Sequence, residues 1–423
     1  MIPANKTIVY VTRDIERAIG LEPGPNYLIV ANETAYSLKI KEKFPNFVTL
    51  IKPTGNKLLG TTELIGHQTT KDIIAKTKGK TADSNNSNDP LILVFKNSLR
   101  VETMIKEIGC QFVNPKSFLA ERVENKLSQI RWLGDLARTM LPSHTAKLAK
   151  LITWKNEPFI MQWAHGHTGD GTMLIHNQEE LSAIQAKFPE RIARLSNYIQ
   201  GPSFTVNVVV TADRIMMGNI SYQITGLPPF TDNPFSTVGN DWALAKKLVT
   251  EKDLVAIRSM VEKIGLKLKA EGWLGLFGLD VIREEKSGRI FLIEVNARQP
   301  ASTTFESALQ AEKRKAGYSG LTTFEAHIRA LLGLPIDQDL IEITDGSQII
   351  QRITANIQSL FDDIGNQLEK KGYDVVVYEN TELNSDLIRI QSHQGIMDGH
   401  GLFNVKGHEI VETIKSSKIN IGV

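Results

Sequence analysis

The segment spanning residues 272–299 constrains the fold of this chain most strongly, because two apolar strand patterns flank a polar turn. LGLFGLDVI (274–282) and IFLIEVNA (290–297) both read as strands, and the intervening EEKSGR contains Gly288. The sequence therefore predicts a β-hairpin. Pairing across this hairpin can bring Asp280 of the first strand beside Glu294 and Asn296 of the second.

The polar residues of this hairpin are suited to binding a divalent cation. Glu294 and Asn296 are two residues apart, so their side chains leave the same face of the strand. Two carboxylates on an otherwise apolar face are costly unless a cation compensates them, and Mg²⁺ is usually held by one or two carboxylates plus substrate phosphates. Arg298 continues the alternation with a planar fork suited to a carboxylate or phosphate. A surface hairpin with ordinary, weak salt bridges would carry the same residues.

The composition limits the partners and the compartment. A chain of 423 residues is long enough for two or three domains, and 49 basic against 47 acidic residues give no reason to expect nucleic acid or a membrane surface as partner. A single cysteine, Cys110, excludes an intramolecular disulfide framework and a multi-cysteine zinc site. No stretch approaches the roughly 20 apolar residues of a spanning helix, and no signal peptide is evident. We therefore expect a soluble, cytoplasmic protein.

The first 115 residues and the following helical stretch have different patterns. Short apolar strands alternate with helices over 1–115, which predicts a small parallel α/β sheet, and no GxGxxG follows any of these strands. The pattern over 117–141 predicts a helix that ends at Pro142 and contains Lys126. A solvent-exposed helix lysine is the alternative to a functional role for Lys126.

A glycine-rich loop, HGHTGDG at 165–171, lies between two predicted strands at 159–164 and 172–176. Its glycines let backbone N–H groups approach an anion closely, although a tight turn would use the same residues. The loop joins strand to strand and lacks a following Lys-Ser/Thr, so it is not a Walker loop. Asn177 and Glu180 after it form a helix start.

Three further stretches complete the pattern. Residues 195–201 predict a strand that runs into a glycine turn, and 203–211 predict an alternating strand. The proline- and glycine-rich stretch 224–241 is too long for a tight turn and is a candidate substrate loop. Residues from 345 to the end predict a separate appendage with four strands.

Taken together, these features resemble the ATP-grasp family over about residues 116–335. The features are Lys126, the glycine hairpin at 166–171, the strand and turn at 196–201, and Asp280 followed by the segment 294–298. The resemblance implies an ATP-grasp fold of two α+β subdomains, so the fold class is α/β with α+β parts. It implies a small parallel α/β domain at 1–115, an N-terminal subdomain at 116–200, a C-terminal subdomain at 201–340 and an α+β appendage at 341–423.

The same resemblance implies a role for each candidate residue. Lys126 would contact the nucleotide phosphates, Arg298 would orient the carboxylate substrate or stabilise its acyl phosphate, and Gln162 would contact the nucleotide. The lid over the phosphates would comprise Gly166, His167, Thr168, Gly169 and Gly171, and the adenine hinge Ser196, Asn197, Tyr198 and Ile199. Asp280, Glu294 and Asn296 would bind one or two Mg²⁺ ions, with Mn²⁺ able to substitute.

The sequence departs from the family pattern at two places. Gln162 stands where the strand before the loop usually carries a lysine, and Ser196 or Asn197 stands where the hinge usually carries an acidic residue. Gln162 can hydrogen-bond a phosphate or adenine, but it supplies no charge.

The function implied by the resemblance is that of an ATP-dependent carboxylate–amine ligase. It would activate a carboxylate as an acyl phosphate, couple it to an amine, and release ADP and phosphate. Its partners would be small molecules, most simply amino-acid-like ones, and a homodimer is compatible with it. A carboxylase of the carboxyphosphate type and a nucleotide-binding regulatory protein are the alternatives.

Overall fold

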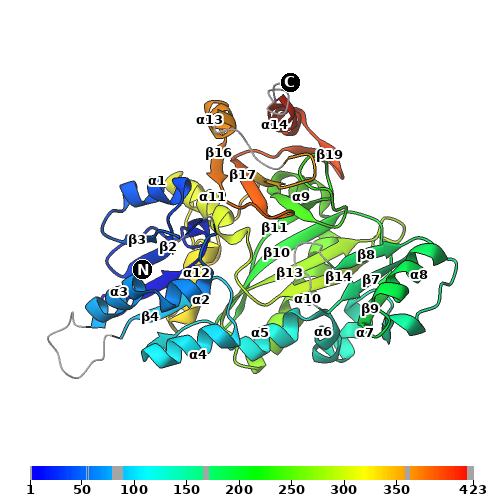
Figure 1. Cartoon of the computed structure of the whole chain (residues 1–423), viewed down its shortest axis with the longest axis horizontal. Helices are drawn as coiled ribbons and strands as arrows, with labels where there is room; N and C mark the ends of the chain where they lie inside the picture. The colour runs from blue at the N-terminus through cyan, green and yellow to red at the C-terminus, as the bar shows by residue number, and fades with distance from the viewer. Residues whose placement is uncertain are drawn as a thin grey trace.

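The structure is a computed structural model that describes residues 2–53, 55, 57–78, 89–164, 171–357 and 363–416. These residues form an N-terminal parallel sheet, a four-stranded antiparallel sheet and a long eight-stranded antiparallel sheet, together with a small two-stranded ribbon. In Figure 1 the blue N-terminal sheet lies at one side, the four-stranded sheet with α8 at the other, and the eight-stranded sheet between them. The predicted mixture of α/β and α+β architecture is confirmed.

The N-terminal sheet has the strand order β3-β2-β1-β4-β5, and every pair is parallel. Its strands are β1 (Ile8–Val11), β2 (Tyr27–Asn32), β3 (Val48–Ile51), β4 (Leu91–Val94) and β5 (Gln111–Phe112). Its helices are η1 (Ile15–Arg17), α1 (Ala35–Lys43), α2 (Thr61–Gly66), α3 (Gln68–Lys78) and α4 (Leu99–Ile108). Two apolar clusters flank β1, one on each face, as expected for short, fully buried parallel strands.

The single helix predicted over 117–141 is divided into three: α5 (Ser117–Glu124), α6 (Lys126–Leu133) and α7 (Asp135–Met140). Asn125 interrupts it with an extended ψ of 119°, and its side chain caps α6 by accepting from the N–H groups of Leu127 and Ser128. Gly134, with φ +60°, ends α6. The break makes Lys126 the first residue of α6, where its N–H donates to the carbonyl of Ala164 (3.1 Å).

The four-stranded sheet has the order β6-β9-β7-β8, and all three of its strand pairs are antiparallel. Its strands are β6 (His144–Leu148), β7 (Phe159–Trp163), β8 (Thr172–Ile175) and β9 (Ile192–Asn197), with η2 (Ala149–Leu151) and α8 (Gln178–Lys187). The strands predicted around the glycine loop therefore pair as a hairpin. Asn177 caps α8 by accepting from the N–H of Glu180 (2.8 Å), as predicted.

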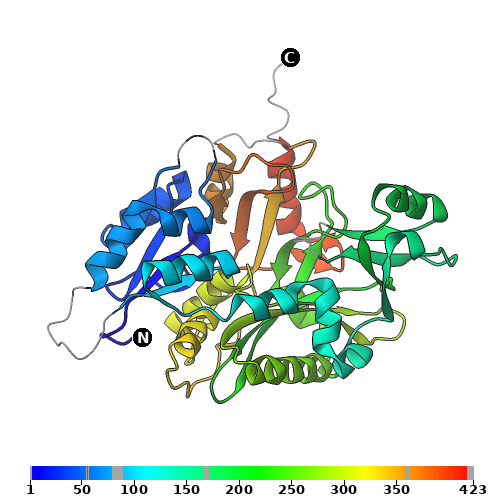
Figure 2. The same cartoon turned by 60° about the horizontal axis from the view of Figure 1, so that its bottom comes forward.

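The eight-stranded sheet has the order β14-β13-β10-β11-β12-β15-β17-β16. Its strands are β10 (Ser203–Val210), β11 (Ile215–Thr225), β12 (Thr237–Asp241), β13 (Gly275–Arg283), β14 (Ile290–Asn296), β15 (Ser347–Arg352), β16 (Asp374–Val377) and β17 (Asp386–Ser392). The associated helices are α9 (Trp242–Leu248), α10 (Glu251–Ala270), α11 (Thr303–Lys315) and α12 (Thr323–Leu331). Helix α10 packs along β10, β11, β13 and β14, and it lies beneath the sheet in Figure 2.

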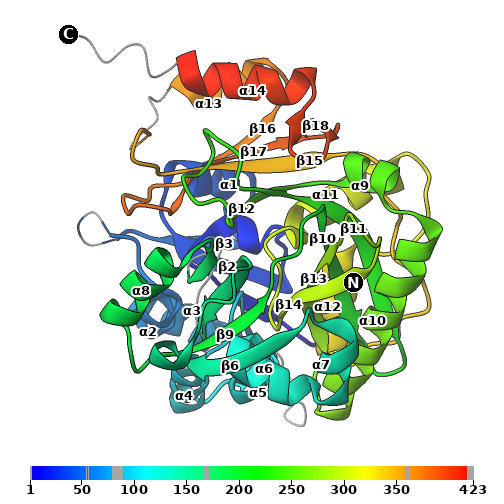
Figure 3. The same ribbon diagram turned by 90° about the vertical axis from the view of Figure 1, so that its right-hand side faces the viewer.

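The C-terminal strands continue this sheet, so residues from 345 onward do not stand apart as the sequence predicted. The last residues of the predicted loop 224–241 form β12, and β12 pairs with β15. The remaining C-terminal elements are α13 (Asp363–Lys370), β18 (Met397–Gly399), β19 (Leu402–Phe403) and α14 (Val405–Ser416). Figure 3 shows α13 and α14 above the orange C-terminal strands, which run on into the green sheet. Apolar side chains of both parts share one core.

No helix in the described ranges is long and apolar enough to cross a membrane.

Candidate functional site

A cavity of about 360 Å³ lies between the four-stranded and eight-stranded sheets. One end is lined from β7 and β9 and by Lys126 of α6, and the middle by the β13–β14 hairpin. The other end is lined by Arg17 of η1, by the segment 300–302 and by side chains of β15 and β17. We call the first the hinge end and the second the arginine end. Most of the residues predicted for the site that the structure describes line this one cavity.

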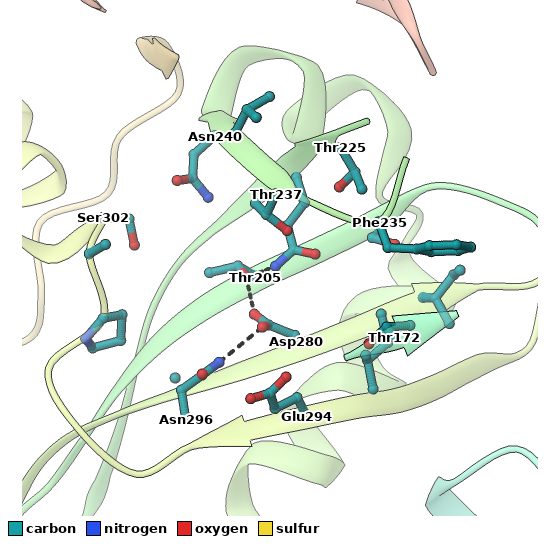
Figure 4. Close-up of a pocket in the computed structure, with 18 of the residues that line it drawn as sticks. Thr172, Thr205, Thr225, Phe235, Thr237, Asn240, Asp280, Glu294, Asn296 and Ser302 are labelled. Atoms are coloured by element: carbon teal, nitrogen blue, oxygen red, sulfur yellow. Dashed lines mark hydrogen bonds between the residues drawn. The ribbon is translucent and has the colours of Figure 1, made fainter. Parts of the chain in front are cut away.

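The hairpin at the middle of the cavity brings Asp280 beside Glu294 and Asn296, as predicted, with a shift of register between Asp280 and Val281. Asp280 is the cross-strand partner of Glu294, and Gly278 is the partner of Asn296. Asn296 Nδ2 donates to Asp280 Oδ2 (2.9 Å), and the hydroxyl of Thr205 on β10 donates to Asp280 Oδ1. Figure 4 shows both bonds, with the Glu294 carboxylate beside them. Since the Asn296 amide donates through its nitrogen, its oxygen is the atom left for a cation.

The electrostatics of the hairpin favour a bound cation. Burial, with the nearby charge of Glu294, raises the pKa of Asp280 to about 6, although bonds from Thr205 and Asn296 act in the opposite direction. Lys126, which is 5% exposed, places Nζ 3.1 Å from Glu294 Oε2. Among the described residues, no group of three or more His, Cys, Asp or Glu could hold a metal alone. The two carboxylates and one amide oxygen fit Mg²⁺, which takes its remaining ligands from phosphates and water.

Arg298 lines the cavity, but it lies beyond the end of β14 and is paired with a residue that the sequence did not indicate. Its guanidinium forms an ion pair with Glu124 at the end of α5, and Lys96 Nζ lies 2.8 Å from the other oxygen of Glu124. Burial alone would raise the pKa of Glu124, but Arg298 and Lys96 hold it below its usual range. Glu124 thus fixes the position of Arg298 beside the hairpin, and no local pattern marks it because α5 is distant in sequence.

Of the predicted nucleotide-binding residues that the structure describes, all except Gly171 line the hinge end of the cavity. Gly166, His167, Thr168 and Gly169 lie outside the described residues, whereas Gly171 accepts from the N–H of Trp163 (2.9 Å). Ser196, Asn197, Tyr198 and Ile199 line the cavity, with Ser196 and Asn197 at the end of β9. Gln162 is buried and donates through Nε2 to Thr172 Oγ1 (3.2 Å).

Arg194, which the sequence reasoning missed, lines the hinge end from the middle of β9. It is 2% exposed, and its Nε and Nη1 have no hydrogen-bond partner among the residues that the structure describes. Burial lowers its pKa to about 10, partly offset by the charge of Glu294. Its position two residues before Ser196 on a strand was the available signal, since alternation places both side chains on one face.

The arginine end was also missed, because its side chains come from distant parts of the chain. Guanidinium nitrogens of Arg17, Arg352 and Arg389 each lie 4.0 Å from the carboxylate of Asp386. That distance is within ion-pair range but too long for a hydrogen bond. Arg17 and Arg389 also donate to the carbonyl of Ala301, at 3.3 and 3.2 Å.

Hydrogen-bonded polar side chains connect the middle of the cavity with the arginine end. Starting from Thr205, the partner of Asp280, each link joins neighbouring strands. Ser221 donates to the Thr205 carbonyl (3.4 Å), Asn240 to the Ser221 hydroxyl (3.0 Å), Gln348 to Asn240 Oδ1 (3.0 Å) and Arg389 to Gln348 Oε1 (3.1 Å). The chain of bonds crosses β10, β11, β12, β15 and β17 in order, so it links the middle of the cavity continuously with the arginine end.

Comparison with known proteins agrees with this geometry. Residues 123–302 match the family model of the ATP-grasp domain. An N5-carboxyaminoimidazole synthase from Aspergillus clavatus, solved with ADP and 5-aminoimidazole ribonucleotide, has a TM-score of 0.61 at 13% identity over 99% of both chains. An L-amino acid ligase from Bacillus licheniformis has a TM-score of 0.58 at 13% identity over 97% of both chains. A search of the curated proteins gave no match.

This chain therefore carries an ATP-grasp domain, and the resemblance inferred from its sequence is confirmed. The fold extends over nearly the whole length of both solved structures, including the N-terminal sheet and the C-terminal strands. At such low identity the likeness establishes the fold, and the reaction has to be inferred from the chemistry of the site.

Proposed function

We propose that this protein is an ATP-dependent, ADP-forming ligase that joins a carboxylate to an amine in the cytoplasm. The observation that carries the proposal is the placement of Asp280, Glu294 and Asn296 in the same cavity as Lys126 and the hinge strand. Ligands for a cation, a buried lysine and a strand end able to hold a base are thus brought together around a space for a nucleotide.

Each group of residues has a part in holding the nucleotide. Backbone groups at 196–199 hydrogen-bond the adenine, and Lys126 contacts the phosphates. Asp280, Glu294 and Asn296 hold Mg²⁺, which when bound neutralises charge that develops on the phosphates. Lys126 neutralises Glu294 in the absence of the nucleotide, since their charged atoms are 3.1 Å apart. Phosphate oxygens then compete for the same ammonium group.

The reaction consists of two displacements. A carboxylate oxygen of the first substrate attacks the γ-phosphorus of ATP, the bond to the β–γ bridging oxygen breaks, and ADP leaves. The amine nitrogen of the second substrate then attacks the acyl carbon, phosphate leaves, and the nitrogen loses a proton. Positioning and charge stabilisation supply most of the catalysis in such steps. Arg298, which forms an ion pair with Glu124, stabilises the acyl phosphate in this proposal.

The arginine end is the proposed site for an anionic group of a substrate. Arg17 and Arg389 direct guanidinium groups at a space they share with Asp386, and a carboxylate or phosphate accepts from such forks. Asp386 in turn suits an ammonium group. The solved structures of similar fold include one with a bound ribonucleotide and one named as an amino acid ligase, and both ligand classes combine an anion with an amine.

The test is ADP release by the purified protein with Mg·ATP and a panel of amino acids and phosphorylated amines, with products identified by mass spectrometry. We expect ADP formation that requires both a carboxylate and an amine. Release of ADP with bicarbonate and an amine alone would instead indicate a carboxyphosphate reaction. Absence of ADP with every pair would overturn the proposal in favour of a regulatory nucleotide-binding protein.

A further inference from the structure

Arg194 is a buried cation that no carboxylate of the described residues contacts directly. No ion pair involving it is present among the described residues, and two of its three guanidinium nitrogens have no hydrogen-bond partner. Burying an unpaired charge costs several kcal/mol in general, because the charge loses its hydration and gains no partner in exchange. The Arg194 guanidinium therefore lacks an ion pair until an anion enters the cavity.

The position of Arg194 on the sheet places its side chain in the cavity, beside residues predicted to contact the nucleotide. Arg194 is the cross-strand partner of Gln162, and Gln162 is the partner of Thr172, so the three side chains leave one face of the sheet. Ser196 of the hinge lies on the same face, and its partner is Ile160. All five side chains line the cavity.

Glu294 is the anion that acts on Arg194 across the cavity, but it does not satisfy the guanidinium. Its charge raises the pKa of Arg194 less than burial lowers it. Its carboxylate is already engaged with Lys126 at 3.1 Å. Arg194 and Glu294 thus line the same cavity without an ion pair between them, and the guanidinium is left to bind a phosphate held near the proposed metal ligands.

We propose that Arg194 binds the phosphate chain of the nucleotide and supplies, from β9, the positive charge that the neutral Gln162 does not supply from the neighbouring strand. This inference rests on the proposed function, because it takes ATP as the ligand. A phosphate is favoured over the uncharged adenine ring, since only an anion offsets the burial of the guanidinium.

The experiment compares binding of adenosine, ADP and ATP to the full-length protein by calorimetry, with Mg²⁺ present. Hydrogen bonds to charged groups contribute about 1.5–3 kcal/mol, so Arg194→Gln should weaken ADP and ATP binding by about 10- to 100-fold. Adenosine binding should change by less than about twofold, because adenosine has no phosphate for Arg194 to contact. Lys147→Gln is the matched control. Lys147 is an exposed cation on β6 of the same sheet, so this variant should bind all three ligands as the unmodified protein does.

A second variant and a stability measurement separate ligand binding from a structural role. Adding Gln162→Lys to Arg194→Gln returns a cation to the adjacent strand and should recover at least part of the lost ADP affinity. Arg194→Gln alone should raise the melting temperature of the nucleotide-free protein, since it removes a buried, unpaired charge. A lowered melting temperature, with all three ligands weakened alike, would show a structural role and overturn the inference.

The remaining outcomes distinguish failure of the Arg194 inference from failure of the proposed ligase function. If the unmodified protein binds ADP and Arg194→Gln binds it equally well, the inference fails while the ligase proposal stands. Loss of adenosine binding together with ADP binding, without loss of stability, would assign Arg194 to the base and overturn the phosphate contact. If the unmodified protein binds neither ADP nor ATP, the proposed function itself fails.

Discussion

The two ends of the cavity are built in different ways. The hinge end and the hairpin come from residues 126–296, within the stretch that matches the ATP-grasp domain, and their elements follow one another along the chain. The arginine end combines η1 of the N-terminal sheet with β15 and β17 of the C-terminal strands, more than 300 residues apart. The difference separates a proposed nucleotide site, carried by one stretch of the chain, from a proposed substrate site to which three parts of the chain contribute.

Hydrogen bonds join the C-terminal strands both to the large sheet and to the N-terminal domain. Arg389 of β17 donates to Gln348 of β15, and Gln348 donates to Asn240 of β12. Tyr378 donates to Glu16 of η1, next to Arg17, and accepts from Arg389 Nε. A continuous sheet therefore holds the arginine end at a fixed distance from the hairpin, which a separate appendage would not do.

The largest expected effect is at the hairpin. If the nucleotide is bound apart from the second substrate, a change in the hairpin should reduce ADP formation with every second substrate. Glu294→Gln removes the negative charge of a proposed Mg²⁺ ligand. We expect ADP formation to fall by about 100- to 1,000-fold, the range seen when a transition-state charge contact is lost. Glu285→Gln, an exposed position in the turn of the same hairpin, is the control. Steady-state ADP release measures both, and activity retained in Glu294→Gln would contradict the metal assignment.

A second prediction uses stability to test whether the hairpin is built for a cation. The folded state raises the pKa of Asp280 from 3.8 to about 6, so it holds a proton more tightly than the unfolded chain. Stability therefore falls as pH rises from about 4 to 6, and the full cost, about 2–3 kcal/mol, is present above pH 6. In EDTA, Asp280→Asn should raise the free energy of unfolding by about this amount at pH 8.

The same variant should gain much less at pH 4.5, where Asp280 is protonated in the folded protein and only the unfolded chain ionises. Urea unfolding at the two pH values measures the difference. An equal effect at both would show that the carboxylate charge is not what destabilises the site. When Mg²⁺ is added, the stabilising effect of Asp280→Asn should disappear, because Mg²⁺ then stabilises the unmodified protein and not the variant.

The sequence predicted that Asp280, Glu294 and Asn296 lie together, because alternation along a strand places Glu294 and Asn296 on one face. Pairing continued from the turn would place Asp280 opposite Ile293. A bulge that the sequence did not show brings it opposite Glu294 instead. Lys126 was placed correctly along the chain but within one long helix, because the pattern over 117–141 does not show how Asn125 and Gly134 break it. Local periodicity therefore identifies a residue such as Lys126 but does not predict the backbone conformation that orients its side chain.

The sequence did not predict the arginine end or Arg194, for two physical reasons. Arg17, Asp386 and Arg389 meet only through pairing of distant strands, which one sequence does not specify. Arg194 looks like an ordinary polar residue at a strand position, and its function follows from burial and from the absence of a hydrogen-bond partner, both of which are tertiary properties. The departure at Gln162 was visible, whereas its cross-strand neighbour was not.

A third prediction separates the two ends directly. Arg17→Gln removes one cation from the arginine end, and we expect the KM for the anionic substrate to rise by about 10-fold, the loss of one charged hydrogen bond. The affinity for ATP should stay within about twofold, because Arg17 does not contact the hinge end. Arg13→Gln, a more exposed arginine beside the same turn, is the control. A rise in the KM for ATP equal to that for the substrate would show that the ends do not act separately.

The smallest effect is expected from the backbone break that aims Lys126. Asn125 caps α6, and Asn125→Ala removes two acceptor contacts to the N–H groups of Leu127 and Ser128, which should lower the free energy of unfolding by about 1 kcal/mol. Asn125→Asp keeps an acceptor and should cost much less. If the break positions the lysine, ATP affinity should fall with Asn125→Ala and be preserved in Asn125→Asp, while the KM for the second substrate is unchanged in both. Equal ATP affinity in the two variants would show that contacts of the Lys126 side chain, such as that with Glu294, suffice to hold it in place.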